Sequence, residues 1–435
     1  MGRSPVAIGA ILAVMAAACG SDGNGAAVKA PRVAQPLSAS VCSPLTYGGE
    51  GKPSLVAVVV GPLQNAYADH GIQNTQSVKL VMQKRGWTAG EHRVALQVCD
   101  EASADEPLDP AKCERLARAV AQNPTVVAVM GPTSSACAAA MMPLLNRAAG
   151  GAIPLVSFSN TYLGLTRDGP GVEKGDPERL YPTGRRSYLR MAPADDAQAA
   201  AAVIVARDAG ARRTFAVYDD STWGKGIAAA FQEAAEREGL SPVGSAEWDP
   251  KARDYRALAA RVRSARPDAV YVGGLVTSNG PRLIRDLGAA LGRRVQMLAP
   301  DGFNQPTALA EGAGERTEGL VITLAAAPVQ ALPAAGRRWS TEFARRWGSK
   351  PCCYAVNAGQ VAEIVLDAIG RSDGGRAKVL DNLFATRVRG GLVGDFSFDR
   401  FGDTTLTSIA VYRIHGARIR FERMIEVPKT LLTRR

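Results

Sequence analysis

The fold is decided by the stretch VVAVMGPTSSACAAAMMPLL, residues 126–145. Its five leading apolar residues predict a strand that is buried on both faces, and the Gly131-Pro132 pair ends that strand. The hydroxyl groups of Thr133, Ser134 or Ser135 can cap the helix that follows, beside the backbone N–H groups that a helix start leaves free. Such a helix start is also a site for an anion such as a carboxylate. Ser134 and Ser135 therefore either cap the helix only or also contact a ligand.

The strand-then-helix order of this stretch repeats through most of the chain. Apolar runs predict strands over residues 55–60, 93–99, 126–130, 153–157, 214–218, 269–273, 295–299 and 320–324. Apolar residues at helical spacing predict helices over 74–84, 111–122, 138–147, 198–208, 226–238 and 282–290, and further helices near 337–347 and 360–368. This alternation is typical of a parallel sheet with helices on both faces.

A segment dense in glycine, proline and charge, residues 167–187, divides this pattern into two halves. We therefore predict an α/β fold of two doubly wound (Rossmann-like) lobes joined by hinge crossings. Lobe 1 is predicted to hold residues 54–193 and 322–375, and lobe 2 residues 194–321 and 376–435. Residues 394–398 and 409–414 are predicted to end the chain as a pair of antiparallel strands. The 167–187 segment is expected to lie near the entrance of the cleft between the lobes.

Polar, glycine or aromatic residues follow five of the predicted strands. They are Ser134 and Ser135, residues 157–161, residues 219–223, residues 274–277, and Asp301. In open α/β sheets, ligands bind outside the carboxyl ends of the strands. Two such lobes in series therefore predict a ligand site in the cleft between them.

The first 53 residues have the composition of an export and anchoring segment. One arginine, an apolar run and the small residues 16–18 predict a secretory signal peptide over residues 1–18. Cys19 resembles the lipid-modified cysteine of bacterial lipoproteins, although Ala16 stands where leucine is usual; the alternative is a plain signal peptide with an incidental cysteine. Residues 19–53 are predicted to be a disordered tether. No later apolar run approaches the length of a membrane span, so we expect an extracytoplasmic protein anchored to the cell membrane by lipid on Cys19.

Six cysteines remain after Cys19. An even number in an exported chain favours disulfides, although six cysteines allow fifteen connectivities. Cys99 and Cys113 flank a short acidic loop and are the first candidate pair. We expect no metal site, because the chain has three histidines and none lies near a CxxC motif. The pairing of the remaining cysteines is left open: Cys42, Cys137, Cys352 and Cys353.

Composition and motifs argue against nucleic-acid binding and catalysis. The formal net charge is +11, but the arginines are scattered and form no basic stripe with interleaved aromatics. The sequence has no phosphate loop, dinucleotide-binding loop, HExxH or GxSxG motif. His70, His92 and His415 are far apart in the sequence, and the Asp219-Asp220 pair is more typical of a helix cap. We therefore predict a binding protein with no catalytic residues and no cofactor, rather than an enzyme.

Six segments together resemble one family. They are VAVVVGPLQNAYADHG, VMGPTSSACAAA, PLVSFSNTYLGLT, FAVYDDSTWGKGIAAAFQEAAEREG, DYRALAARVRSARPDAVYVGG and LAPDGFN. Their order is that of the type I periplasmic-binding-fold solute-binding proteins, and most of all of the leucine/isoleucine/valine-binding proteins of ABC transporters. The resemblance covers about residues 55–324 and is weaker beyond. The same fold serves amide sensors and receptor ectodomains, so the fold by itself leaves the function open.

The resemblance implies roles for residues of the first half. Ser134 and Ser135 resemble the serines that hold the α-carboxylate of the ligand. The segment of Asn160 and Thr161 resembles one that contacts the carboxylate and amine through backbone and hydroxyl groups. Charge-assisted hydrogen bonds and the dipole at a helix start both favour a carboxylate at such a place.

Further roles are implied for the second half. Asp301 matches the acidic residue that takes the α-ammonium, Asp195 matches a second polar contact, and Trp223 stands where an aromatic closes over the ligand. The alternatives are that Asp301 caps a turn, that Trp223 packs on a lobe surface, and that Asp195 or its neighbour Asp196 only caps a helix. His70 stands near a position where a tyrosine is usual, and this departure changes the pocket for the ligand's side chain.

The resemblance implies a substrate-binding lipoprotein of an ABC importer. Such a protein binds an amino acid or similar small polar ligand between its lobes and delivers it to a permease in the membrane. The alternative is a ligand-sensing protein that reports to a membrane receptor or kinase. An enzyme that uses the cleft for chemistry is a third interpretation, which the missing nucleophile–base motifs argue against.

Overall fold

We describe the fold from a computed structural model, which describes residues 2, 33–38, 40–416 and 418–433. Apart from residue 2, the predicted signal peptide lies outside the described residues, and so do Cys19 and residues 20–32 of the predicted tether. Within the described part of the chain, no helix combines the length and the apolar character that a membrane crossing needs.

Lobe 1 is built on a six-stranded sheet in the order β2-β3-β1-β4-β5-β6. Neighbouring strands are parallel except for β2, which runs antiparallel to β3. The carboxyl ends of β1, β4 and β5 therefore lie at the same edge of the sheet. The strands are β1 (Leu55–Gly61), β2 (Thr88–Ala89), β3 (His92–Asp100), β4 (Val126–Met130), β5 (Leu155–Ser157) and β6 (Tyr188–Arg190).

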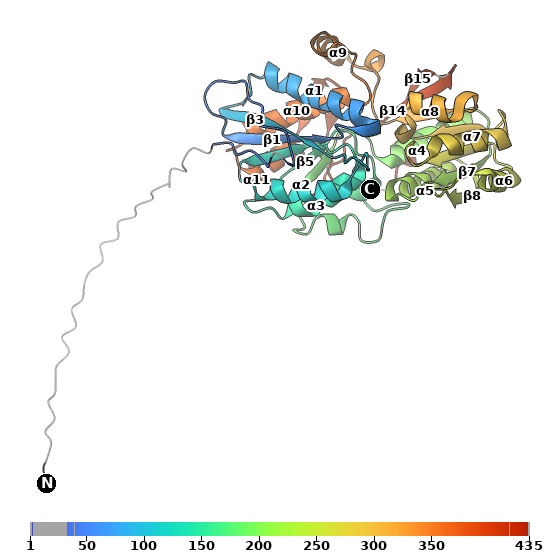
Figure 1. The fold of residues 1–435 in the computed structure, drawn as a ribbon, viewed down its shortest axis with the longest axis horizontal. Helices are drawn as coiled ribbons and strands as arrows, with labels where there is room; N and C mark the ends of the chain where they lie inside the picture. The colour runs from blue at the N-terminus through green and yellow to red at the C-terminus, as the bar shows by residue number, and fades with distance from the viewer. Residues whose placement is uncertain (1, 3–32, 39, 417, 434–435) are drawn as a thin grey trace. The chain divides into compact units, whose positions relative to one another are not determined.

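Helices cover both faces of this sheet (Figure 1). Successive residues of a strand point to opposite faces. In β1, Ala57 and Val59 belong to a core with the first group of helices, whereas Val56 and Val58 belong to a core with the second group. The first group is α1 (Ala68–Lys84), α10 (Ala355–Gly370) and α11 (Arg376–Phe384), and the second is α2 (Pro110–Gln122) and α3 (Ser135–Asn146).

Lobe 2 is built on a seven-stranded sheet in the order β15-β14-β11-β10-β9-β7-β8. The strands from β11 to β8 are parallel, while β14 runs antiparallel to both β11 and β15. The strands are β7 (Arg213–Tyr218), β8 (Ser241–Glu247), β9 (Ala269–Gly273), β10 (Gln296–Ala299), β11 (Val321–Leu324), β14 (Ser408–His415) and β15 (Arg418–Glu426).

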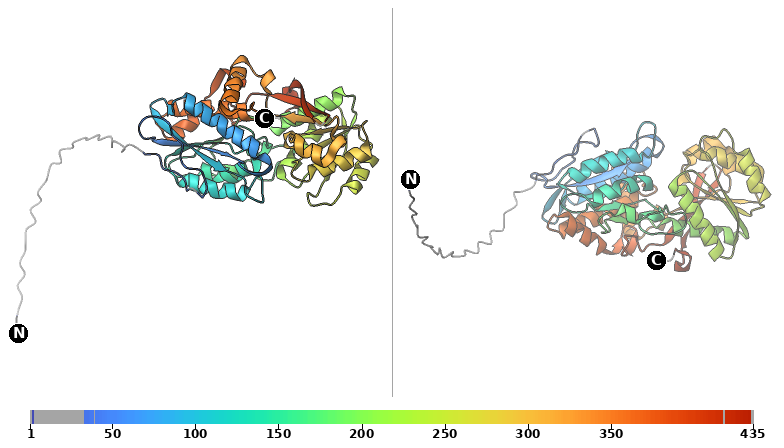
Figure 2. Two further views of the ribbon diagram at one scale, coloured as in Figure 1. Left: turned by 45° about the horizontal axis from the view of Figure 1, so that its top comes forward. Right: turned by 90° about the horizontal axis from the view of Figure 1, so that it is seen from below.

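The helices of lobe 2 also form two layers, and Figure 2 shows the two lobes side by side. The pair α4 (Asp195–Asp208) and α5 (Thr222–Arg237) packs on one face of the sheet, in a core that continues into lobe 1. The other face carries α6 (Arg256–Ser264), α7 (Gly280–Leu291) and α8 (Pro306–Ala313). The expected fold class, two α/β lobes with mostly parallel sheets, is therefore confirmed.

The remaining elements are a helix, a two-stranded ribbon and short 3₁₀ helices. Helix α9 (Ala334–Trp347) packs with α1 and with the two-stranded ribbon of β12 (Arg387–Gly391) and β13 (Gly394–Ser397). Short 3₁₀ helices complete the connections: η1 (Asn65–Tyr67), η2 (Leu163–Leu165), η3 (Glu178–Leu180), η4 (Asp301–Phe303), η5 (Gly314–Thr317), η6 (Val329–Ala331) and η7 (Lys429–Leu431).

The structure divides the chain between the lobes differently from the sequence prediction. Strand β11 belongs to the sheet of lobe 2, although residues from 322 onward were assigned to lobe 1. Helix α11 packs on α10 and β4 of lobe 1, although residues from 376 onward were assigned to lobe 2. The predicted pair of final strands is wrong, because β13 pairs with β12 and β14 pairs with β11 and β15. The chain crosses between lobes after β6, after β11 and after α11, and local periodicity does not mark these crossings.

Residues 33–38 and 40–53, which were predicted to belong to a disordered tether, instead lie against lobe 1. Cys42 forms a disulfide with Cys99 of β3, and Thr46 forms a bridge with Leu96 of the same strand. The buried Gln97 side chain donates a hydrogen bond to the Ser43 carbonyl, with an N–O distance of 2.8 Å. The tether prediction is therefore wrong for these residues.

The predicted Cys99–Cys113 disulfide is also wrong. Cys113 lies on α2 and pairs with Cys137 on the neighbouring helix α3. Cys99 lies in β3, where its partner comes from the segment before the sheet. Closeness in sequence misled the prediction, because the 101–109 loop carries the two cysteines to different layers. Cys352 and Cys353 are free thiols.

Buried ion pairs fasten the chain where it passes between the lobes. The Asp403 carboxylate accepts hydrogen bonds from Arg190 Nε at 2.7 Å and from Arg167 Nε at 2.6 Å. Arg167 also pairs with Asp196 at the start of α4, with an N–O distance of 3.4 Å. The two arginines hold the pKa of the Asp403 carboxyl at about 2, below its usual range, although burial acts in the opposite direction.

Candidate functional site

A cavity of about 650 Å³ is lined by residues of both lobes. Most of its lining comes from the segments that follow the carboxyl ends of β4 and β5 in lobe 1 and of β7, β9 and β10 in lobe 2. Of the residues predicted for the site, the cavity is lined by Ser134, Ser135, Thr161, Trp223, Asp301 and His70. Asn160 and Asp195 are not among the lining residues.

The turn after β4 brings the start of α3 to the cavity. Gly131 has a φ of +98°, and a Cβ atom there would lie 2.2 Å from the Val60 carbonyl oxygen, so only glycine fits this close approach. The next residues position Ser134 as the N-cap, whose hydroxyl accepts a hydrogen bond from Cys137 N at 3.3 Å. The Ser135 hydroxyl accepts one from Tyr162 N, also at 3.3 Å. Both serines thus have structural partners while they line the cavity.

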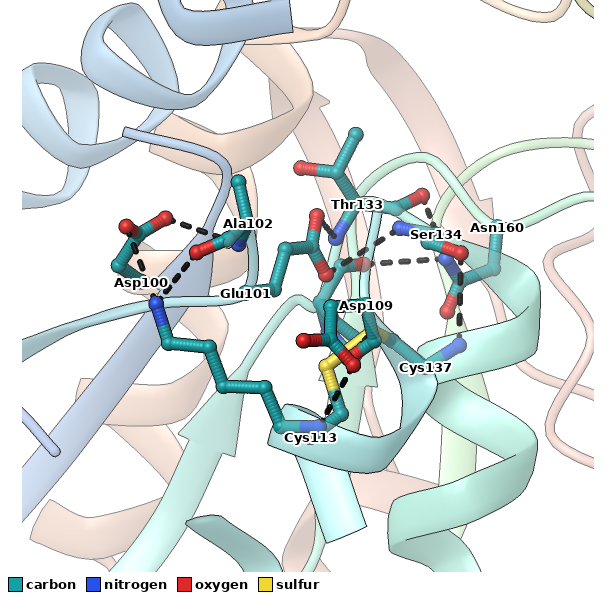
Figure 3. The surroundings of a disulfide bond; sticks show 11 residues. Asp100, Glu101, Ala102, Asp109, Cys113, Thr133, Ser134, Cys137 and Asn160 are labelled. Atoms are coloured by element: carbon teal, nitrogen blue, oxygen red, sulfur yellow. Dashed lines mark hydrogen bonds and ion pairs between the residues drawn. A yellow bond between two sulfur atoms is a disulfide. The ribbon is translucent and has the colours of Figure 1, made fainter. Parts of the chain in front are cut away.

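A carboxyl group of the protein itself already lies at this helix start (Figure 3). Glu101 is fully buried and accepts hydrogen bonds from the backbone N–H of Thr133 at 3.1 Å and of Ser134 at 3.5 Å. Burial raises the pKa of Glu101 to about 8, although these two N–H groups act in the opposite direction. Glu101 therefore already accepts hydrogen bonds from these two N–H groups. The hydroxyls of Ser134 and Ser135 belong to the lining of the cavity.

Asn160 and Thr161 have different roles in the structure, although both were predicted from the sequence to contact the ligand. Asn160 is fully buried, and its amide donates hydrogen bonds to the carbonyls of Pro132 at 3.0 Å and Thr133 at 2.8 Å. It therefore joins the turn after β5 to the turn after β4. Thr161 faces the cavity, and its hydroxyl accepts a hydrogen bond from Trp223 of lobe 2 at 3.0 Å.

Trp223 connects the two lobes at the edge of the cavity. It lies in the first turn of α5, which Ser221 caps by accepting a hydrogen bond from Gly224 N. The indole Nε1 donates to Thr161 Oγ1 and, at 3.1 Å, to Asp195 Oδ1. Trp223 therefore lines the cavity while its Nε1 joins α5 to Thr161 of lobe 1 and to Asp195.

Asp195 is a buried acid behind Trp223. It is the first residue of α4, three residues earlier than the predicted helix start, and it is 1% exposed. Burial raises its pKa to about 8, with nearby Asp301 acting in the same direction. Its Oδ2 atom has no hydrogen-bond partner among the described residues. In this structure Asp195 positions Trp223.

Asp301 follows β10 and lines the cavity from the side of lobe 2. Its Oδ1 accepts a hydrogen bond from Gln198 Nε2 at 3.0 Å, and its Oδ2 accepts one from the Tyr354 hydroxyl of lobe 1 at 2.5 Å. Both donors are neutral, and burial raises the pKa of Asp301 above its usual range. A cation placed in the cavity would stabilise the charged form of this carboxylate.

Aromatic and sulfur-containing side chains also line the cavity. His70 and Tyr67 lie on α1 and the turn before it, with ring centroids 6.0 Å apart. Burial lowers the pKa of His70 below its usual range, which favours the neutral ring. The Cys353 sulfur lies 3.2 Å from His70 Nε2. Leu275 of lobe 2 adds apolar surface.

Several lining residues were not among the site residues predicted from the sequence, namely Tyr67, Thr133, Ser159, Tyr162, Cys353 and Tyr354. Thr133, Ser159 and Tyr162 are neighbours of predicted site residues, so their position after a predicted strand could have identified them. Tyr67 follows the turn after β1 and could have been found in the same way. Tyr354 and Cys353 precede α10 in sequence, and no strand end marks them.

Two α/β lobes with a ligand-sized cavity at the carboxyl ends of their strands define the type I periplasmic binding fold. The sequence profile of a family described as periplasmic binding protein matches residues 59–418, and the chain belongs to this family. The resemblance seen in the sequence is thereby confirmed.

Individual relatives share this fold at low identity. Leu/Ile/Val-binding protein BraC3 of Rhizobium johnstonii is 24% identical over 373 residues, which cover 84% of this chain and 92% of that protein. The leucine binding protein LivK from Thermotoga maritima superposes with a TM-score of 0.71 at 22% identity, over 86% of this chain and 99% of that chain. An ABC-transporter solute binding protein from R. palustris in complex with benzoate has a TM-score of 0.67 at 17% identity, over 85% and 96% of the two chains.

The Asp195→Asn variant should gain stability over the parent as the pH rises. The unfolded chain ionises this carboxyl near pH ~3.9, whereas the folded chain holds its proton up to about pH 8. The contribution of Asp195 to the free energy of unfolding is thus fully present below the pKa of the unfolded chain, and it is lost as the pH rises toward and through the pKa of the folded chain. Asparagine does not ionise, so the variant does not lose stability in this way. We expect a difference on the order of 1–4 kcal/mol at pH 7, measured by urea unfolding at several pH values.

The control is Asp208→Asn at an exposed ion pair. Hydrogen bonds from Arg423 and Arg207 lower the pKa of Asp208, so any pH-dependent effect there is confined to acid. A stability difference between Asp195→Asn and the parent that stays constant from pH 5 to pH 8 would contradict the prediction.

Proposed function

We propose that the protein is an extracytoplasmic substrate-binding lipoprotein of an ABC importer, which binds an amino acid or a similar small polar ligand between its lobes and delivers it to a permease. One observation carries the proposal. The cavity has the hydroxyl-bearing start of α3 on the side of lobe 1 and the half-buried carboxyl of Asp301, with neutral partners only, on the side of lobe 2. These groups complement the two charged ends of an amino acid.

In this proposal the ligand's carboxylate lies against the hydroxyls of Ser134, Ser135 and Thr161. The positive end of the α3 dipole favours a negative charge there. The ammonium lies against Asp301, so that the carboxylate charge, which has only neutral partners in the protein, gains an ion-pair partner. Tyr67, His70 and Leu275 surround the space left for the ligand's side chain.

Closure of the lobes is proposed to carry the signal to the permease. Trp223 and Asp301 of lobe 2 bind Thr161 and Tyr354 of lobe 1 directly. A ligand that contacts both lobes stabilises the arrangement in which these contacts form, because it binds that state more tightly. The permease would then recognise the surface formed by the two lobes together.

The comparisons support this role and a binding rather than enzymatic function. The matched family is one of periplasmic binding proteins, and the relative from Rhizobium johnstonii is named a Leu/Ile/Val-binding protein. A solved structure of this fold from Desulfitobacterium hafniense contains Leu, whereas the R. palustris protein contains benzoate. The fold thus accommodates both kinds of ligand, and we propose the amino acid because of Asp301.

A thermal-shift screen should reveal an α-amino acid ligand. A ligand present at about a hundred times its dissociation constant stabilises the folded state by roughly 2.7 kcal/mol, which raises the melting temperature measurably. The screened chain must include residues 33–53, because Cys42 pairs with Cys99. Amino acids, amides, aromatic carboxylates, short peptides and sugars are compared. Stabilisation by another class, with no amino acid among the hits, would refute the amino-acid assignment.

The Asp301→Asn variant should bind the amino acid found in that screen at least roughly a hundredfold more weakly. Removing one partner of a buried ion pair costs about 3–5 kcal/mol, and asparagine keeps the size and one acceptor atom of Asp301. Isothermal titration calorimetry measures the change. Asp220→Asn removes a charge from the same lining at an exposed position and should leave the affinity within a few-fold. Equal affinities of parent and Asp301→Asn would remove Asp301 from the site.

Replacement of Cys19 by serine should release the protein from membranes. The proposed anchor is a lipid attached to the Cys19 sulfur, and serine provides no thiol for it. Cell fractionation of the native producer compares the parent with Cys19→Ser, and Cys352→Ser serves as a control at another accessible cysteine. Retention of Cys19→Ser in the membrane fraction at the level of the parent would contradict lipid anchoring.

A further inference from the structure

Three side chains that bind soft metals converge beside the ligand cavity. His70 belongs to α1, whereas Cys352 and Cys353 precede α10, and the packing of α1 on α10 brings them together. One ligating atom from each of the three residues lies within 4.8 Å of those of the other two. The shortest of these separations that the structure records is 3.2 Å, between Cys353 Sγ and His70 Nε2.

We propose that His70, Cys352 and Cys353 form a binding site for a thiophilic metal ion, with Zn²⁺ as the ion that fits the donor set. Zinc is bound in proteins by cysteine thiolates and histidine nitrogens, and three protein ligands leave its fourth position open. The same donors do not suit the hard cations Ca²⁺ and Mg²⁺, which take oxygen ligands. Both cysteines are free thiols, so neither donor is used by the two disulfides.

The geometry is close to that of a zinc site. With Zn–S near 2.3 Å and Zn–N near 2.0–2.1 Å, tetrahedral ligand atoms are roughly 3.3–3.8 Å apart. The recorded separation of 3.2 Å lies close to this range, and the upper limit of 4.8 Å on the other separations is compatible with it. Two groups hold the thiol segment in place: Gln73 Oε1 accepts a hydrogen bond from Cys352 N at 2.8 Å, and Asn304 Nδ2 lies 3.6 Å from Cys353 Sγ.

An ion can reach these residues from a second cavity. That cavity has a volume of about 990 Å³ and is lined by all three proposed ligands. His70 and Cys353 also line the 650 Å³ cavity, so the cluster forms part of the wall between the two. An entry path of this kind is one requirement of a metal site. A bound ion would lie next to Tyr354, whose hydroxyl binds Asp301, and would place positive charge beside the proposed ligand site.

Titration with Zn²⁺ tests the proposal directly. The chain used carries Cys19→Ser, so that its thiols outside the two disulfides are Cys352 and Cys353. After treatment with a phosphine reductant, mass spectrometry verifies that the two disulfides are intact. Calorimetry should then show one Zn²⁺ bound per chain. Titration with Co²⁺ should show a thiolate-to-cobalt charge-transfer band, which reports sulfur ligation independently of any ligand in the cavity.

Variants distinguish this cluster from adventitious binding. Cys352→Ser with Cys353→Ser should abolish both the stoichiometric Zn²⁺ and the cobalt band, and His70→Ala should weaken Zn²⁺ at least roughly tenfold, as expected for loss of one ligand. His92→Ala is the matched control, because His92 lies elsewhere in lobe 1 with its ring at the Ser372 carbonyl, and it should bind as the parent does. If the double variant does not fold, the exposed Cys352→Ser carries the test alone.

Three results would overturn the proposal. They are no stoichiometric Zn²⁺ binding to the reduced chain, binding that Cys352→Ser and His70→Ala leave unchanged, and binding that His92→Ala weakens as much as His70→Ala. None of these results bears on the amino-acid screen, because the titration is made without that ligand. Failure of the metal site and failure of the proposed transport function are therefore separate outcomes.

Discussion

The buried carboxylate of Asp403 accepts hydrogen bonds from two arginines, and both sides of the binding cavity depend on these contacts. Arg190 ends β6 and also donates from Nη1 to the Tyr162 carbonyl at 2.7 Å. Arg167 connects the same carboxylate to Asp196 in the first turn of α4. In a buried cluster, loss of one partner leaves an uncompensated charge, which costs about 3–5 kcal/mol. The turn after β5 and the start of α4, which both lie next to the cavity, are therefore held by the same buried ion-pair cluster.

The same ion-pair cluster also positions residues at the edge of the cavity. Arg190 holds Tyr162, which directly follows Thr161 in the chain, and Arg167 holds Asp196, which directly follows Asp195. These contacts therefore also fix the positions of Thr161 and Asp195. Thr161 and Asp195 both accept hydrogen bonds from the Trp223 indole, which joins the lobes at the cavity edge. The position of the aromatic side chain over the cavity thus follows from a chain of contacts that begins at the crossings.

The acidic side chains differ between the two sides of the cavity, and this difference supports the proposed amino-acid ligand. Glu101 lies behind the α3 start and binds two of its N–H groups, with a pKa raised to about 8. In its neutral form it leaves the hydroxyls of Ser134 and Ser135 to meet an anion without repulsion. Asp301 faces the cavity itself and has only neutral donors as partners. The favoured place for a cation is therefore on the side of lobe 2.

The amino-acid sequence determined eight strands of the two sheets, the order of the two lobes and the use of strand ends as the site, because these follow from local periodicity and from the rule that parallel strands end at one edge. It did not predict β6, β8 or β15. Strand β4 matches its predicted bounds, and six of the predicted site residues line the cavity. Only the tertiary structure decided that Asn160 joins two turns and that Asp195 lies behind Trp223, since a sequence does not say where a loop side chain points. The same holds for contacts between distant segments: Cys42 with Cys99, Asp301 with Tyr354, and His70 with Cys353. Packing of whole elements, rather than any local pattern, brings these atoms together.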